Sequence, residues 1–202
     1  MFLAEAVVCL VILALLLRRD LSPIGRHPFR GGWKLAAVVA GLFVVQAMVI
    51  LYVPGQTALQ MTVLILSQVV LVLLVILNHH LPGAKLLALG IVLNTTVMVA
   101  NGGWMPITAE MNHFVHPDRV VEELDRAPNS KGITLPRSET RLWILSDIVR
   151  VKVPWRRTVV SVGDLVVLAG IAQFIFQATS RKQPPSPASV TAGDGMKPAG
   201  AE

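Results

Sequence analysis

Five long apolar stretches, separated by polar connections, dominate the pattern of the chain. An apolar segment of about 20 residues can remain in hydrocarbon as a helix, because a helix satisfies its own backbone N–H and C=O groups. The pattern therefore predicts an all-α fold, an integral membrane helical bundle of five transmembrane helices within residues 1–180. The predicted spans are residues 2–17, 33–53, 58–77, 85–100 and 159–178.

Two further segments are predicted to be non-helical or peripheral. Residues 101–158 form one long outer loop, and its apolar run Leu142–Val149 is too short to cross a bilayer. We interpret that run as an interfacial or re-entrant segment.

Thr108 is predicted to cap a short helix ending at His116. Residues 181–202 are rich in Pro, Ala, Gly and Ser without periodicity, which predicts a disordered tail.

Composition and charge agree with a lipid environment. Of the 202 residues, 53% are hydrophobic and 15% are charged, against roughly 25% charged in a typical soluble domain. The net charge of +6 is interpreted as a topology signal and as contact with anionic lipid, so no nucleic-acid partner is predicted. The first connection carries Arg18, Arg19, Arg26, Arg30 and Lys34, whereas residues 54–57 carry no basic residue. This asymmetry predicts the N-terminus outside and the C-terminus in the cytoplasm.

Carboxamides at membrane depth are the first candidates for function. Gln46, Gln68 and Asn94 fall near one mid-bilayer layer when depth is counted at about 1.5 Å per helical residue. Such amides either hydrogen-bond between helices or line a polar cavity for a ligand. The pattern leaves both interpretations open.

Asp164, near the start of the last predicted span, is the second candidate. A carboxylate in a membrane is costly unless it is paired or hydrated. Ser161 lies on the same helix face and can bridge Asp164 to Arg150 or Arg157. Asp164 is therefore predicted to belong to a structural ion pair or a helix cap, with a functional acid as the alternative.

The hexad from Asn101 to Pro106 is the third candidate. Gly102 and Gly103, followed by Pro106, must end the fourth predicted helix. Glycines also let the backbone approach a neighbour closely, so this turn is either a plain helix stop or part of a binding site.

Signals for catalysis or metal binding are weak. His113, His116 and Asp118 have a spacing that suits one metal ion, but further ligands are not evident. Cys9 is the single cysteine, and no nucleophile–base pair or phosphate-binding loop is recognisable. We predict no enzyme activity, no cofactor and no metal.

Three sequence elements resemble a family of small multi-pass bacterial membrane proteins classed as a domain of unknown function. The elements are Asn-Gly-Gly-Trp-Met-Pro at residues 101–106, the stretch Glu139–Ile148, and Ser-Val-Gly-Asp at residues 161–164. The resemblance implies a bacterial inner-membrane protein with no established activity. All three elements are predicted at the outer face, where we hypothesise a small polar pocket with Leu142–Val149 as its lid. Its candidate residues are Asn94, Asn101, Gly102, Gly103, Asp147, Ser161 and Asp164.

The favoured function is a structural or accessory membrane component. Its partners would be the lipid bilayer and a second copy of the chain or another membrane protein. The alternative is a small transporter or channel-like protein that uses the outward-facing pocket. No internal repeat is visible, which argues against an inverted-repeat transporter.

Overall fold

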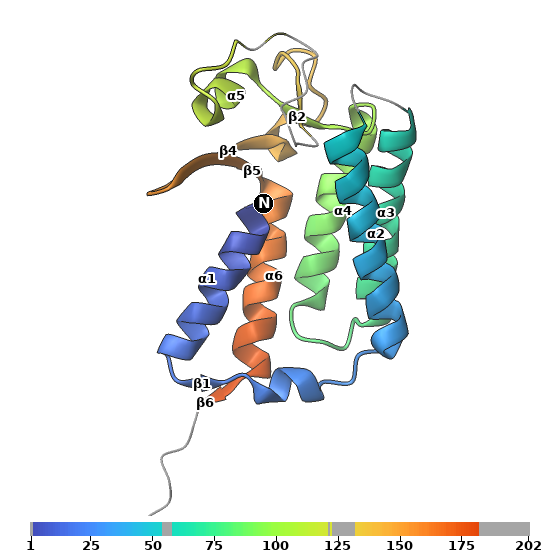
Figure 1. Cartoon of the computed structure of the whole chain (residues 1–202), viewed down its shortest axis with the longest axis vertical. Coiled ribbons are helices and arrows are strands. Elements are labelled where there is room, and N and C mark those ends of the chain that lie inside the picture. The colour runs from blue at the N-terminus through green and yellow to red at the C-terminus, as the bar shows by residue number, and fades with distance from the viewer. Residues whose placement is uncertain (1, 54–57, 121, 123–131, 182–202) are drawn as a thin grey trace, which may run out of the picture.

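A computed structural model describes residues 2–53, 58–120, 122 and 132–181. Within these residues, five long helices form a layer, and a small curled sheet with a short helix covers one end of it (Figure 1). The fold is mixed α/β, so the predicted all-α bundle of five transmembrane helices is wrong. The error lies in residues 101–158, because the segment interpreted as a loop supplies the strands and the short helix.

The helices of the layer occupy the apolar stretches of the sequence. In space the last of these helices in the chain lies between the first helix and the helix of residues 84–100, so the order across the layer differs from chain order (Figure 1). From one edge to the other, the helices are α1 (Phe2–Leu16), α6 (Val162–Ala178), α4 (Ala84–Ala100), α3 (Ala58–Leu77) and α2 (Gly32–Tyr52). Residues 159–161 were predicted to be helical but belong to a strand, so α6 begins three residues later than expected.

The sheet at one end of the layer has the strand order β3-β2-β4-β5. Its strands are β2 (Met105–Ile107), β3 (Gly132–Thr134), β4 (Asp147–Val153) and β5 (Arg156–Ser161). Strand β2 runs parallel to β3 and β4, and β4 and β5 form an antiparallel hairpin. The predicted re-entrant run Leu142–Val149 is instead shared between the 3-10 helix η2 (Trp143–Leu145) and β4.

The short helix α5 (Ala109–Val115) lies beside this sheet (Figure 1). The Thr108 side chain accepts a hydrogen bond from the Met111 backbone N–H at 3.3 Å, so the predicted cap is confirmed. The sheet is anchored to the layer by a buried apolar cluster drawn from both. Its members are Leu64, Val97, Met98, Trp104, Met105 and Ile133.

Two short strands and a 3-10 helix close the opposite end of the layer. Strands β1 (Arg19–Asp20) and β6 (Ser180–Arg181) pair antiparallel, and the 3-10 helix η1 (Ser22–Arg26) follows β1 (Figure 1). The Arg19 guanidinium donates to the carbonyl oxygens of Phe176 and Thr179 at 2.7 and 2.8 Å. These carbonyls lie in the last turn of α6 and just after it, where helical partners are lacking, so Arg19 closes the helix end and is not only a topology signal.

One helix among the described residues is long and apolar enough to cross a membrane, namely Ala58–Leu77. The other apolar helices, such as Ala84–Ala100 and Val162–Ala178, are shorter. The predicted disordered tail after Arg181 and the predicted turn at residues 54–57 lie outside the described residues.

Candidate functional site

Asn94, Ser161 and Asp164 form a closed hydrogen-bonded triangle where α4 meets the start of α6. Ser161 is the residue before α6, and its Oγ accepts the backbone N–H of Asp164 at 3.0 Å as a helix cap. The same hydroxyl donates to Asn94 Oδ1 at 2.7 Å. Asn94 Nδ2 then donates to Asp164 Oδ1 at 2.7 Å. Each residue thus orients the next, and Ser161 and Asn94 are 0% and 5% exposed.

Glycines bring the backbones of α4 and α6 into direct contact beside this triangle. A Cβ added to Gly163 would lie 2.1 Å from Asn94 Oδ1, and one added to Gly90 would lie 2.6 Å from the Gly163 carbonyl oxygen. About two turns further along α6, a Cβ at Gly170 would meet the Gly83 carbonyl oxygen at 2.9 Å. The four glycines line the α4–α6 seam, the line of contact between these two helices. Any side chain at these positions would push the helices apart.

The seam glycines are the residues that the sequence analysis missed. Gly83 and Gly90 are seven residues apart, and so are Gly163 and Gly170. A seven-residue spacing keeps two positions on nearly the same face of a helix. Two such pairs in two apolar segments are a usable signal for close helix packing, and small residues at membrane-type helix contacts have this role.

Asn101 ends α4 and fastens a distant loop to it. Its Nδ2 donates to the Val97 and Arg141 carbonyl oxygens at 2.8 and 2.9 Å, and its Oδ1 accepts the Arg141 backbone N–H at 2.9 Å. Gly102 and Gly103 follow with φ of 74° and 93°, a left-handed conformation that favours glycine. The helix therefore stops at the predicted place, and the chain turns directly into β2.

Asp147 begins β4 beside the triangle. In the sheet register its Cα partners are Ser161 on β5 and Ile107 on β2. The structure thus brings Asn94, Ser161 and Asp164 into contact and places the backbone of Asp147 next to them. Asn101, Gly102 and Gly103 lie at the end of α4, where Asn101 bonds to Arg141 and not to the triangle.

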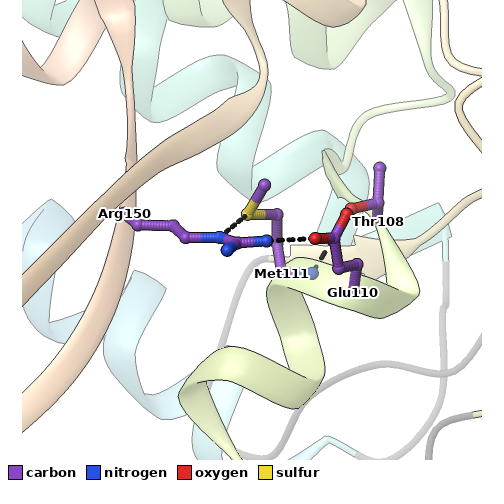
Figure 2. A network of polar contacts seen from close by, with 4 residues as sticks. All are labelled: Thr108, Glu110, Met111 and Arg150. Atoms are coloured by element: carbon purple, nitrogen blue, oxygen red, sulfur yellow. Dashed lines mark hydrogen bonds and ion pairs between the residues drawn. The ribbon is translucent and has the colours of Figure 1, made fainter.

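The predicted arginine partners of Asp164 are engaged elsewhere. Arg150 pairs with Glu110, and its Nε lies 3.2 Å from the Met111 sulfur; Figure 2 shows both contacts together with the Thr108 cap. Arg157 lies over the Phe114 ring at 5.8 Å from its centroid. The predicted ion pair of Asp164 with Arg150 or Arg157 is therefore wrong, and the alternative of a helix cap is what the structure contains.

A third arginine of the same hairpin holds the first helix. Arg156 Nη1 lies 2.8 Å from Glu5 Oε1, which ties the start of α1 to β5. This contact joins residues that are far apart in the chain. Nothing in the sequence pattern assigned Arg156 to Glu5 in preference to its three basic neighbours.

Gln46 and Gln68, which were predicted at the same membrane depth as Asn94, do not form one cluster with it. The Gln46 Oε1 atom is buried without a hydrogen-bond partner, and Gln68 is half-buried. Gln60, which the analysis did not single out, donates to the Val53 carbonyl oxygen at 2.7 Å and joins α3 to the end of α2. Within the described residues, no group of three or more His, Cys, Asp or Glu is placed to hold a metal ion.

Two hollows of the described surface lie away from the triangle. One of about 450 Å³ lies at the end of the layer opposite the sheet, where residues of α2, α3, α4 and α6 meet. The other, of about 510 Å³, lies between α3 and α4 and is lined by valines, Leu73, Thr95, Thr96 and Ala100. Neither is lined by Asn94, Ser161 or Asp164.

Comparisons with known proteins identify a family and one relative. A sequence model described as a family of unknown function (DUF5317) matches residues 26–176. An uncharacterized protein of Thermotoga maritima is 38% identical over 112 residues, which is 55% of this chain and 60% of that protein. The chain thus spans less than two thirds of this relative's length. No solved structure matches the chain. The predicted resemblance to a family of unknown function is confirmed, whereas the multi-pass membrane character expected with it is not supported by these matches.

Proposed function

The chain belongs to the family of unknown function DUF5317, and we propose that it is a structural or accessory component of the bacterial inner membrane. In this proposal α3, which is long and apolar enough to cross a membrane, lies in lipid together with the apolar faces of the helices beside it, and the sheet covers the outer end. The seam between α4 and α6 then serves as the rigid joint that carries the sheet.

The distribution of residues around α3 is the observation that carries the proposal. The buried residues of this helix are Gln60, Leu64 and Ser67, so two of the three are polar. Its exposed face is apolar, and only 22% of its most apolar window is buried within the protein. The exposed residues include Leu59, Leu66, Val69, Leu73, Ile76 and Leu77, at 44–60% exposure. A core helix of a water-soluble protein has the reverse distribution, because water favours polar exteriors.

Other helices of the layer share this exterior. Val8 and Leu16 on α1 are 57% and 75% exposed, and Val38 and Met48 on α2 are 59% and 53% exposed. Single exposed apolar residues are normal, but an apolar surface that continues over several helices indicates a membrane or a protein partner. Lipid chains would cover all of these faces at once. A second copy or another membrane protein would cover one of them, which fits an accessory role.

The closed triangle supports a structural role over transport. The side chains of Asn94 and Ser161 hydrogen-bond to each other and to Asp164. The seam glycines bring α4 and α6 so close together that no space for a ligand remains beside them. A transport site needs polar groups that face a path. In lipid, by contrast, buried polar contacts and small residues are what hold helices together.

Cysteine accessibility tests location and orientation together. Cys9, the single cysteine, would first be replaced by serine, and single cysteines introduced as Leu66→Cys on α3, Lys152→Cys on the sheet and Gly25→Cys at the opposite end. We expect a membrane-impermeant maleimide to label Lys152→Cys in intact cells. It should label Gly25→Cys only in inverted vesicles, and Leu66→Cys only after the membrane is dissolved.

Each failure of this experiment has a distinct meaning. Rapid labelling of Leu66→Cys without detergent would put the helical layer in water and end the membrane proposal. Labelling of Gly25→Cys in intact cells, with Lys152→Cys protected, would reverse the orientation and leave the membrane location standing. The Cys9→Ser protein is the control for labelling elsewhere.

A further inference from the structure

The hollow at the end of the layer opposite the sheet has apolar walls and two polar lining residues. It has a volume of about 450 Å³, within the roughly 300–1,000 Å³ of small-molecule sites. Its walls are apolar and include Leu35 and Val39 of α2, Leu74 of α3 and Phe174 of α6. Its polar lining residues are Arg30 and Asn78. A ligand that fits this groove must be apolar in its body.

Hydrogen bonds fix Arg30 at the rim of this groove. Its backbone N–H donates to Asn78 Oδ1 at 2.8 Å, and Asn78 Nδ2 donates to the Arg30 carbonyl oxygen at 3.4 Å. Asn78 is 5% exposed, so the anchor itself is buried. Nearby, His80 Nε2 lies 3.0 Å from the Pro28 carbonyl oxygen, which holds the preceding residues over the same end. The Arg30 side chain, in contrast, is exposed.

The end of the layer around this rim is strongly basic. Asp20 is the single acidic residue of the segments 17–35, 78–86 and 179–181, and its Oδ1 accepts hydrogen bonds from Ser22. The basic residues of these segments are Arg18, Arg19, Arg26, Arg30, Lys34, Lys85 and Arg181. Of these, Arg19 is occupied by the end of α6, whereas Arg18, Arg26, Arg30, Lys34 and Lys85 are exposed. The charge of this rim therefore favours a negatively charged ligand.

We propose that this groove binds an acyl chain of an anionic phospholipid, with the lipid phosphate against Arg30 and the neighbouring cations. The complementarity has two parts, an apolar groove for the chain and a basic rim for the headgroup. Basic pockets between membrane helices on the cytoplasmic side recognise lipid headgroups in this manner. The inference rests on the proposed membrane location, and it adds a specific lipid to a general bilayer.

Lipid titration of the full-length protein in a neutral detergent tests this assignment. Thermal unfolding would be followed while phosphatidylglycerol, or phosphatidylcholine with the same acyl chains, is added. We expect phosphatidylglycerol to raise the unfolding temperature at a lower concentration. Arg30→Gln should weaken that effect about fivefold, as expected for the loss of one basic residue near an anionic surface. It should leave the effect of phosphatidylcholine unchanged.

Three further samples locate the effect. Ala40→Phe places a ring in the groove and should weaken the response to both lipids. Lys152→Gln removes an exposed charge at the sheet end and should change nothing. Inorganic phosphate alone should give no shift. Because Arg30 anchors to Asn78 through its backbone, Arg30→Gln keeps these bonds and decides the question even where Ala40→Phe fails to fold.

The outcomes that overturn the assignment are separate from those that end the membrane proposal. Equal responses to the two lipids, or equal losses in Arg30→Gln and Lys152→Gln, would remove the headgroup site. A full shift with inorganic phosphate would make the ligand a free anion. Protein that passes the cysteine experiment but fails here remains a membrane component without this lipid site.

Discussion

The sheet and helix α3 of the layer differ in the kind of residue that each exposes. In the sheet, Met105, Ile133 and Val160 are buried, at 0–4% exposure, and Arg150 and Lys152 point outward. In α3 of the layer, Gln60 and Ser67 are buried and leucines cover the exterior. The first arrangement suits water and the second suits hydrocarbon. In the proposed membrane location, one chain therefore meets two solvents, with the boundary where the sheet rests on the layer.

A charge placed on each exterior gives the largest expected contrast. Leu66→Arg puts a cation on the exposed middle of α3, where insertion into lipid would cost about 2.5–3.5 kcal/mol. Ile144→Arg is its match on the sheet end, since Ile144 is 62% and Leu66 is 54% exposed. We expect Leu66→Arg to lower the amount of protein in alkali-washed membranes severalfold and Ile144→Arg to leave it unchanged. Equal amounts of the two variants would abolish the contrast between the two exteriors.

The α4–α6 seam is the next most sensitive part. In Gly163→Ala, the new methyl group would lie 2.1 Å from Asn94 Oδ1 and 2.8 Å from the Gly90 carbonyl oxygen. The helices must separate, and overpacking of this kind costs about 1–3 kcal/mol. Gly41→Ala in α2 is the control, because a Cβ there meets nothing within 4 Å and alanine favours a helix. Unfolding in detergent should show a loss only for Gly163→Ala, and similar stabilities would mean that the seam is loose.

The triangle separates a structural amide from a working acid. Asn94→Ala leaves the Ser161 O–H without its acceptor and Asp164 Oδ1 without its donor, at a cost of about 1–3 kcal/mol. Asp164→Asn keeps an oxygen that can accept the Asn94 N–H, so its stability should stay close to that of the native protein. Both variants would be followed by unfolding in detergent and by complementation of a deletion strain. A stable Asp164→Asn protein that fails to complement would favour the transport alternative.

The ion pair between Arg156 and Glu5 has the smallest expected effect. Its side chains are 34% and 37% exposed, and exposed pairs contribute about 0.2–1 kcal/mol. A double-mutant cycle with Arg156→Gln and Glu5→Gln should give a coupling energy in this range that falls as salt is added. A coupling energy unaffected by salt would mean that the pair lies in lipid. The boundary between lipid and water would then lie within the sheet and not where the sheet rests on the layer.

The helices of the layer could be predicted from the sequence, but the sheet was missed. Long apolar runs identify helices without tertiary information, because their length alone restricts the alternatives. Strand β4 carried a period-two signal, with Val149, Val151 and Val153 alternating with Arg150 and Lys152. We instead assigned this segment to an outer loop and interpreted Arg150 as a possible partner of Asp164. Strands β2 and β3 have three residues each, too few for any period to show.

The candidate site was predicted by residue type and missed in its contacts. The spacing of Ser161 and Asp164 allowed a helix cap, which depends on local sequence only. The bond from Asn94 to Asp164 joins positions 70 residues apart, and it forms because α6 returns between α1 and α4. No local pattern encodes that return. The paired glycines of α4 and α6 held the available signal for it.

Spin-label accessibility along α3 tests the central claim most directly. In the Cys9→Ser protein in lipid nanodiscs, nitroxides would be attached at Leu59→Cys, Leu66→Cys and Leu73→Cys, with Lys152→Cys on the sheet as the control. If the helical layer lies in lipid, collisions with oxygen will exceed those with a water-soluble nickel chelate on α3, most strongly at Leu66→Cys, and the order will reverse on the sheet. Nickel collisions at Leu66→Cys as frequent as those at Lys152→Cys would contradict the account.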